Sequence, residues 1–245
     1  MHPIICKIGP FTIFSYGVMM ALAVLICSFL LSRDFRRLKK SEDFVFDFVF
    51  WIVVGGITGA RLFYIVLNPD YFRDDLLETI RIQNGGLAWQ GGFAGAVLTG
   101  LFLIRKNFLP LWETLDLAAP YIALGQSIGR IGCFLNGCCY GKEVSWGIYF
   151  PVYHARLHPT QLYESASLLM IFLILKRYQA VGRSAGKPAG RVFILYLVLA
   201  SLERFIVEFF RADHVTMGPG LSIFQMVSLI FFFSALYANT FIKSR

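Results

Sequence analysis

Three arginines lie inside or at the edge of long apolar segments, where charged residues are scarce. Arg130 ends an apolar run that begins near residue 117, and Arg61 and Arg204 lie in two other runs. A charged side chain at bilayer depth costs about 3 kcal/mol on insertion scales, so such residues pair with an acid, face a cavity or hold an anionic ligand. Guanidinium groups bind phosphate through two parallel hydrogen bonds. Arg130 and Arg204 are therefore the first candidates for a phosphate site.

Glycines and polar side chains accompany these two arginines. Arg130 lies in the segment 129–141, whose four glycines leave the backbone bare, so that a ligand or another backbone can come close. Glu208 follows Arg204 by four residues and shares its helix face. This pair is either a structural ion pair that neutralises itself or an arginine that Glu208 orients toward phosphate. The segment between them adds further polar side chains: His158, Gln161, Tyr163 and Glu164.

Gln90 is a polar side chain in the glycine-rich segment 85–92, at the start of another apolar run. It either packs between helices or faces the same cavity as Arg130. The sequence contains no P-loop, dinucleotide fingerprint or Gly-x-Ser-x-Gly motif. We therefore expect no nucleotide-driven chemistry and no cofactor.

The chain has five cysteines and no C-x-x-C pair, so no disulfide framework follows from them. Cys133, Cys138 and Cys139, together with His154 and His158, are residue types that bind zinc. Their spacing is not a usual zinc pattern, and a buried cysteine ordinarily serves as a small apolar side chain. We expect packing and no metal, with a zinc site or a disulfide in this loop as the alternatives.

These residues must be positioned by helices in a membrane. Hydrophobic residues make up 57% of the 245 residues and charged residues only 16%, whereas soluble domains carry about 25% charged residues. Gly55 and Gly59 are spaced so that a neighbouring helix can approach one run closely. We predict an all-α polytopic membrane protein, one domain over residues 1–245, with seven transmembrane helices near 11–31, 44–67, 87–104, 117–135, 162–175, 192–210 and 221–241.

The positive charge lies mostly in alternate loops. Fourteen of the 23 lysines and arginines fall in the gaps on one side of the predicted spans, and six fall on the other. Since cytoplasmic loops are enriched in lysine and arginine, the N-terminus is predicted outside and the C-terminus in the cytoplasm. The net charge of +8 therefore indicates membrane topology and no nucleic-acid partner. Segment 129–141 and the end of the sixth span fall at the outer surface.

Several motifs resemble the phosphatidylglycerol:prolipoprotein diacylglyceryl transferase family, and the resemblance covers essentially the whole chain. They are Gly129-Arg130-Ile131-Gly132, His158-Pro159-Thr160-Gln161-Leu162-Tyr163-Glu164, and Arg204-Phe205-Ile206-Val207-Glu208-Phe209-Phe210-Arg211. The first is the family signature, and in combination with the second it is highly specific.

The resemblance implies a bacterial inner-membrane enzyme whose active site faces the outer leaflet. It implies transfer of the diacylglyceryl group of phosphatidylglycerol to the lipobox cysteine of prolipoprotein signal peptides, the first step of lipoprotein maturation, with release of glycerol 1-phosphate. By position, Arg130 and Arg204 correspond to phospholipid-binding and catalytic arginines. Further binding positions implied in this way are Tyr16, Asn136, Gly141 and Glu208.

Three positions depart from the family pattern. Gln90 stands where well-studied members have a histidine thought to deprotonate the thiol, and Cys133 and Cys138 stand where asparagine and glutamate are frequent. We expect His158 or Glu208 to take the proton, or the arginines to lower the thiol pKa. Two other functions stay open: a divergent phospholipid-dependent transferase with another acceptor, and a non-catalytic lipid-binding membrane protein.

Overall fold

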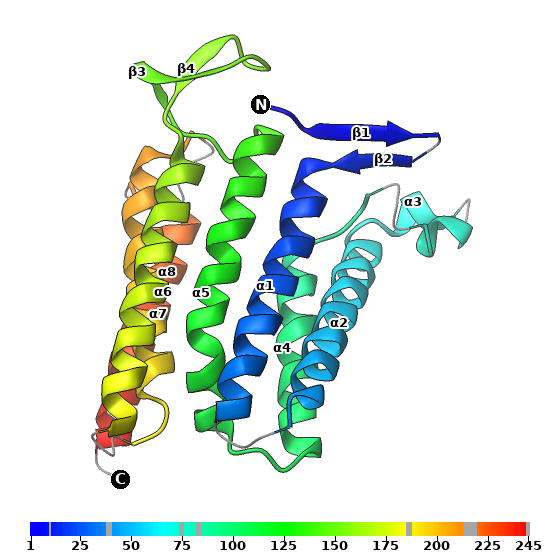
Figure 1. The fold of residues 1–245 in the computed structure, drawn as a ribbon. Coiled ribbons are helices and arrows are strands. Elements are labelled where there is room, and N and C mark those ends of the chain that lie inside the picture. Colours follow the sequence, from blue (N-terminus) through cyan, green and yellow to red (C-terminus); the bar gives the residue numbers. More distant parts are fainter. Residues whose placement is uncertain are drawn as a thin grey trace. The chain divides into compact units, whose positions relative to one another are not determined.

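The computed structural model describes residues 1–9, 11–37, 41–73, 76–81, 85–184, 188–212 and 220–243, and these residues are mostly helical (Figure 1). Each of the seven predicted apolar segments coincides with a long helix. These helices are α1 (Ser15–Arg37), α2 (Asp43–Leu67), α4 (Trp89–Lys106), α5 (Leu111–Asn136), α6 (Thr160–Ser184), α7 (Arg191–Val207) and α8 (Ile223–Lys243). Short helices are α3 (Pro69–Arg73), η1 (Leu76–Thr79) and η3 (Glu208–Phe210).

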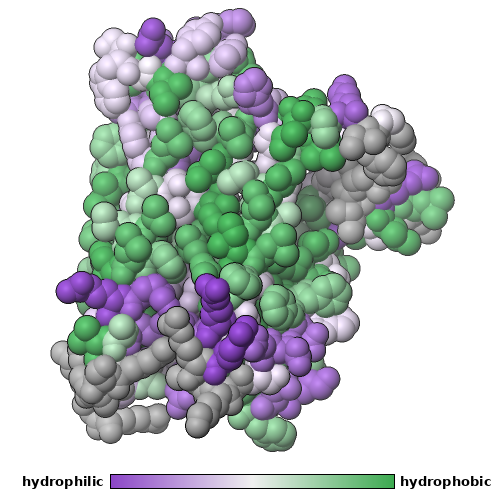
Figure 2. All heavy atoms as spheres, in the orientation of Figure 1, coloured by the Kyte–Doolittle hydropathy of each residue, from purple (hydrophilic) through white to green (hydrophobic). Residues whose placement is uncertain are grey.

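Hydrophobic side chains cover the middle of the helices, and hydrophilic ones gather toward the helix ends (Figure 2). Within the described ranges, three helical segments are long and apolar enough to cross a membrane by length and composition: Ser15–Arg36, Asp43–Leu67 and Ile223–Thr240. The prediction of a helical membrane protein is therefore supported, while the count of seven spans stays a prediction.

The strict all-α prediction needs correction, because two antiparallel hairpins accompany the helices. One pairs β1 (Ile4–Ile8) with β2 (Phe11–Phe14), and the other pairs β3 (Glu143–Phe150) with β4 (Ala155–Leu157). The first predicted span thus begins too early. Its first four residues form β2, and α1 begins at Ser15, whose backbone N–H donates to the Pro3 carbonyl at 2.9 Å.

The described chain forms two compact units, residues 1–31 with 115–245, and residues 32–114. The prediction of a single domain stays a prediction. In the first unit, α5, α6 and α7 share a core of small and branched side chains: Ala119, Ala123, Leu168, Ile171, Leu175, Val192 and Tyr196. Ser127 and Ser165 join α5 to α6, since each hydroxyl donates to the other residue's carbonyl, at 2.8 and 2.9 Å. Such polar pairs stabilise helix packing where no water is available.

The start of α7 is fixed by an acid on α5. The carboxylate of Asp116 accepts the backbone N–H groups of Gly190 at 2.7 Å and Phe193 at 2.8 Å. These are donors that a helix N-terminus leaves without intrahelical partners. Gly190 has a φ of 98°, which glycine adopts without strain, so the chain can turn sharply into α7. The C-terminal end of α7, which carries Arg204, is thereby set against α5 and α6.

In the second unit, α2 and α4 pack closely through glycines, as the spacing of Gly55 and Gly59 predicted. A Cβ at Gly59 would lie 2.9 Å from the Cα of Gly95, and one at Gly55 would lie 2.8 Å from the Cβ of Thr99. Real side chains essentially never approach so closely. The small residues are therefore needed for the two backbones to approach.

Candidate functional site

Three arginines and two glutamates form ion pairs with one another near the end of α5, the start of α6 and the end of α7. In Figure 1 the β3–β4 hairpin lies next to these ends of α5 and α6. We call these five residues the arginine cluster: Arg130, Arg204, Arg211, Glu164 and Glu208. Glu164 lies on the first turns of α6, and its side chain is 1% exposed. It forms ion pairs with Arg130, with Arg204 at 2.9 Å and with Arg211 at 3.4 Å. One buried carboxylate thus joins three helix ends.

Glu208 is the second acid of the cluster and is also 1% exposed. Its Oε2 lies 2.8 Å from Nη2 of Arg204 and 3.9 Å from Nε of Arg211. The hydroxyl of Ser222 donates to its Oε1 at 2.8 Å. The predicted pairing of Arg204 with Glu208 is therefore present, and Glu208 is held on both of its oxygens.

Two arginines of the cluster remain partly exposed, and the cluster has more positive than negative groups. The side chains of Arg130 and Arg204 are 28% and 22% exposed, whereas both carboxylates are buried. Counted over these five residues alone, three guanidinium groups exceed two carboxylates by one positive charge, and an unpaired charge is unfavourable in a site of low dielectric. The guanidinium of Arg204 also lies over the ring of Phe224, 4.9 Å from its centroid. The arrangement fits an anionic group with several oxygens, such as phosphate.

A third acid, Glu203, precedes Arg204 on α7. Its Oε1 accepts the hydroxyl of Ser167 at 3.0 Å, so it is held by α6. It lies near enough to Arg130 and Arg204 to contribute to their electrostatic field. We keep it outside the cluster because its hydrogen bond is to a neutral hydroxyl.

Gly141 and His158 lie beside the cluster. The N–H of Gly141 donates to the carbonyl of His158 at 2.9 Å, and Gly141 also bridges to Arg211. A Cβ at Gly141 would lie 2.5 Å from both the Cβ of His158 and the carbonyl oxygen of Phe210, so only glycine fits. Nδ1 of His158 lies 3.2 Å from the hydroxyl of Tyr163. The structure therefore brings His158 to the edge of the cluster.

The other predicted site residues are more dispersed. Tyr16 is 42% exposed on the first turn of α1 and lies against Gly132 of α5. Asn136 is the last residue of α5 and is exposed. Gln90 lies on the first turn of α4 in the second unit. Its predicted place opposite Arg130 stays a prediction.

Glu164 and Arg211 were not among the predicted site residues. In the sequence, Glu164 is one of several polar side chains in its segment, and Arg211 is the last residue of a family motif. The sequence signal for Glu164 is its position near the start of an apolar helix. An ionisable group in such a segment usually pairs with a group of opposite charge.

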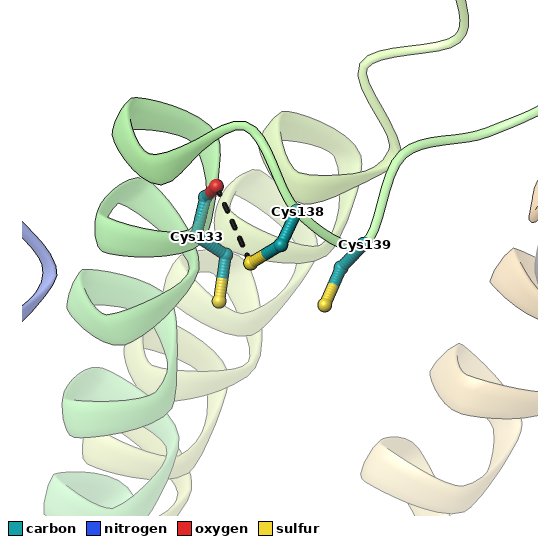
Figure 3. Close-up of side chains that lie close together, drawn as sticks. All are labelled: Cys133, Cys138 and Cys139. Atoms are coloured by element: carbon teal, nitrogen blue, oxygen red, sulfur yellow. Dashed lines mark hydrogen bonds between the residues drawn. The ribbon is translucent and has the colours of Figure 1, made fainter. Parts of the chain in front are cut away.

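The three cysteines that close α5 also lie together (Figure 3). The sulfur atoms of Cys133, Cys138 and Cys139 all lie within 4.8 Å of one another, and each residue is half-buried. The thiol of Cys138 donates to the Cys133 carbonyl at 3.7 Å. Within the described ranges, neither His154 nor His158 joins this group. The three cysteines therefore lie as one group, and the expectation that they serve packing and hold no metal stays a prediction.

The comparisons with known proteins all point to one family. The family model described as prolipoprotein diacylglyceryl transferase matches residues 3–240. Three curated relatives carry the name phosphatidylglycerol–prolipoprotein diacylglyceryl transferase. The protein of Halalkalibacterium halodurans is 35% identical, and the match covers 94% of this chain and 82% of the relative. That of Trichormus variabilis is 36% identical, covering 93% and 84%, and that of Lactiplantibacillus plantarum is 32% identical, covering 96% and 87%.

Proposed function

We propose, from the premise that this chain belongs to the prolipoprotein diacylglyceryl transferase family, that the arginine cluster is where phosphatidylglycerol gives up its diacylglyceryl group. The enzyme transfers that group to a prolipoprotein. One observation supports the placement most strongly: three arginines share two buried carboxylates, and two of these arginines remain partly exposed. The cluster therefore favours one further anionic group, which the phosphodiester of the lipid supplies.

The chemistry at this site is displacement at carbon. The thiolate of the lipobox cysteine attacks the glycerol carbon that bears the phosphate, a carbon–sulfur bond forms, and the carbon–oxygen bond breaks. The electron pair leaves with the phosphate, which becomes glycerol 1-phosphate. Since the phosphate gains charge as the bond breaks, Arg130 and Arg204 stabilise the transition state more than the bound diester.

Glu164 and Glu208 act as positioning residues. Arginines that are already held in place need no reorientation when charge develops on the phosphate. Glu164 holds both Arg130 and Arg204, and Glu208 also holds Arg204. Glu208 contacts two arginines and accepts from Ser222, which makes it a poor acceptor for the thiol proton. His158 remains the side-chain base at the edge of the cluster, because the amide of Gln90 is not basic near pH 7.

The membrane placement is part of the same proposal. All seven long helices span the bacterial inner membrane as one domain, with the N-terminus outside and the C-terminus in the cytoplasm. The charge asymmetry of the loops and the coincidence of each apolar segment with a helix support this. The cluster then lies toward the outer leaflet, where the signal peptide presents its cysteine. Binding positions for the lipid include Tyr16, Asn136 and Gly141.

The function is tested with purified protein in phosphatidylglycerol bilayers and a signal peptide that carries a lipobox. The expected result is a peptide bearing a diacylglyceryl thioether, together with an equal amount of glycerol phosphate. A peptide with serine in place of the lipobox cysteine is the matched control and gains nothing. Release of glycerol phosphate without modification of the cysteine peptide would instead favour a transferase with another acceptor. Neither product from well-folded protein would favour a lipid-binding role.

A further inference from the structure

We propose that Cys133, Cys138 and Cys139 bind one zinc ion, whose fourth ligand is the thiol of the acceptor cysteine. The inference rests on the proposed function for the identity of that acceptor. From the sequence we expected no metal, because the spacing of the three cysteines matches no usual zinc pattern. The grouped sulfurs change that expectation (Figure 3).

The distances suit a tetrahedral metal. Zinc bonds thiolate sulfur at about 2.3 Å, which sets neighbouring sulfurs about 3.8 Å apart. The three sulfurs already lie within 4.8 Å of one another, so closure on an ion needs a movement of about one ångström. Cys138 and Cys139 are only half-buried, so on this proposal the fourth ligand reaches the group from their side.

The chain reverses after α5 and so brings Cys138 and Cys139 back beside Cys133. Helix α5 ends at Asn136, and Gly137 takes a φ of 82°, which reverses the chain. The N–H groups of Gly137 and Cys138 then both donate to the Cys133 carbonyl, at 3.0 and 3.2 Å. Cys139 has a φ of 62°, an unfavourable conformation for a residue with a Cβ. Such strain persists only where the surroundings fix it.

The start of α6 fixes this loop from the other side. The side-chain amide of Gln161 donates to the carbonyl of Cys138 at 2.6 Å, and the hydroxyl of Thr160 donates to that of Cys139 at 2.8 Å. Both side chains are fully buried. The thiols are therefore positioned in advance, as a metal site requires.

Positive charge lies beside this group of sulfur atoms. Arg130 lies close enough to interact with Cys133 and Cys139, and Arg211 hydrogen-bonds Cys139. Three thiolates around a divalent ion leave one negative charge, which these arginines offset. Sulfur ligands select zinc over magnesium or calcium.

A zinc site with three protein ligands keeps its fourth position for substrate, and a thiol bound there is deprotonated outright. The acceptor thiol would release its proton to solvent on binding and attack the lipid as a thiolate. The carbon–sulfur bond forms, the carbon–oxygen bond breaks, and zinc keeps its oxidation state. A thiolate formed in this way needs no side-chain base, so on this proposal His158 would not have to take the proton.

The first test is metal content in protein purified under reducing conditions and measured by elemental mass spectrometry. We expect about one zinc per chain in the wild type. Cys133→Ser, Cys138→Ser and Cys139→Ser should each lose most of it. Cys6→Ser is the matched control, since Cys6 is exposed and distant in sequence, and it should keep the metal. Equal zinc in the three cluster variants and the wild type, or a disulfide among these cysteines, would overturn the proposal.

The second test uses cobalt, whose sulfur-to-metal absorption reports the number of bound thiolates. Adding the lipobox peptide to cobalt-substituted protein should raise this absorption by about a third, from three thiolates to four. The serine peptide should leave it unchanged. Full-rate transfer by metal-free protein would remove zinc from the reaction and leave the proposed function standing. Zinc-bound wild type that makes no thioether would instead contradict the proposed function.

Discussion

Arg61 and Arg130 both lie on apolar helices, yet their partners differ in kind. Arg61 is 6% exposed, and its five N–H donors all reach backbone carbonyls, those of Glu78, Thr79, Arg81, Gly85 and Gly86. Arg130 is partly exposed and pairs with a carboxylate that Arg204 and Arg211 share.

Every N–H donor of Arg61 is taken by a neutral backbone carbonyl. These hydrogen bonds hold the segment before α4 in place, so this arginine has a structural role. The shared carboxylates hold the arginines of the cluster in place and do not fully neutralise them, so the cluster can still bind an anionic ligand. The comparison teaches that burial of an arginine does not by itself indicate a ligand. The groups that its N–H donors contact indicate whether the arginine has a structural role or binds a ligand.

The largest expected effect is on catalysis. Arg130→Lys and Arg204→Lys should each lower transfer about 100-fold, because lysine keeps the charge but loses the planar pair of donors. Arg61→Lys, the matched control, should keep the rate per folded molecule within a few-fold. Transfer is measured as thioether formed per minute in the same bilayer composition. Equal losses in all three variants would erase the distinction between the two kinds of arginine.

The next expected effect is on stability, where the Arg61 variant should lose more than the Arg130 variant. Arg61→Lys should lower the free energy of unfolding by about 2 kcal/mol, because several backbone carbonyls lose the hydrogen bonds that the buried Arg61 donates. Arg130→Lys should change it less, since its side chain is partly exposed. Thermal unfolding in one detergent compares the two. An Arg61 variant as stable as the wild type would argue against its structural role.

The smallest expected effect is on the transfer rate when the hydrogen bond that orients Glu208 is removed. Ser222→Ala removes the hydroxyl that donates to Glu208 and should slow transfer only a few-fold. Ser228→Ala is the matched control, because its hydroxyl bonds a carbonyl of its own helix, α8. The loss should appear in kcat with little change in KM, since orientation of Arg204 matters most as the phosphate gains charge. A raised KM at unchanged kcat would show that Glu208 serves ground-state binding instead.

Local patterns in the sequence were enough for the helices, for the contact at Gly55 and Gly59, and for the pair of Arg204 with Glu208. These features depend on residues near one another in the chain or on helix periodicity. The role of Glu164 depends on three helices meeting, which no local pattern contains. The start of α1 was misplaced because the apolar residues of β2 continue directly into the helix.

The sequence offers a site at the cysteine group only as an alternative to packing, for a different reason. Its spacing gives no zinc pattern, and the three sulfurs meet only because Gly137 and Cys139 adopt positive φ angles. Glycine after a helix predicts a reversal of the chain, but a left-handed cysteine does not follow from its residue type. Long-range bonds from Thr160 and Gln161 hold that conformation.

Binding of the leaving group tests the central claim most directly. Titration of glycerol 1-phosphate into detergent-solubilised protein, followed by calorimetry, measures the affinity of the cluster for phosphate without requiring turnover. We predict that the wild type and Arg61→Lys bind with the same affinity, and that Arg130→Gln binds at least about tenfold more weakly because a charged donor is lost. Unchanged binding by Arg130→Gln would contradict the assignment of the cluster as the phosphate site.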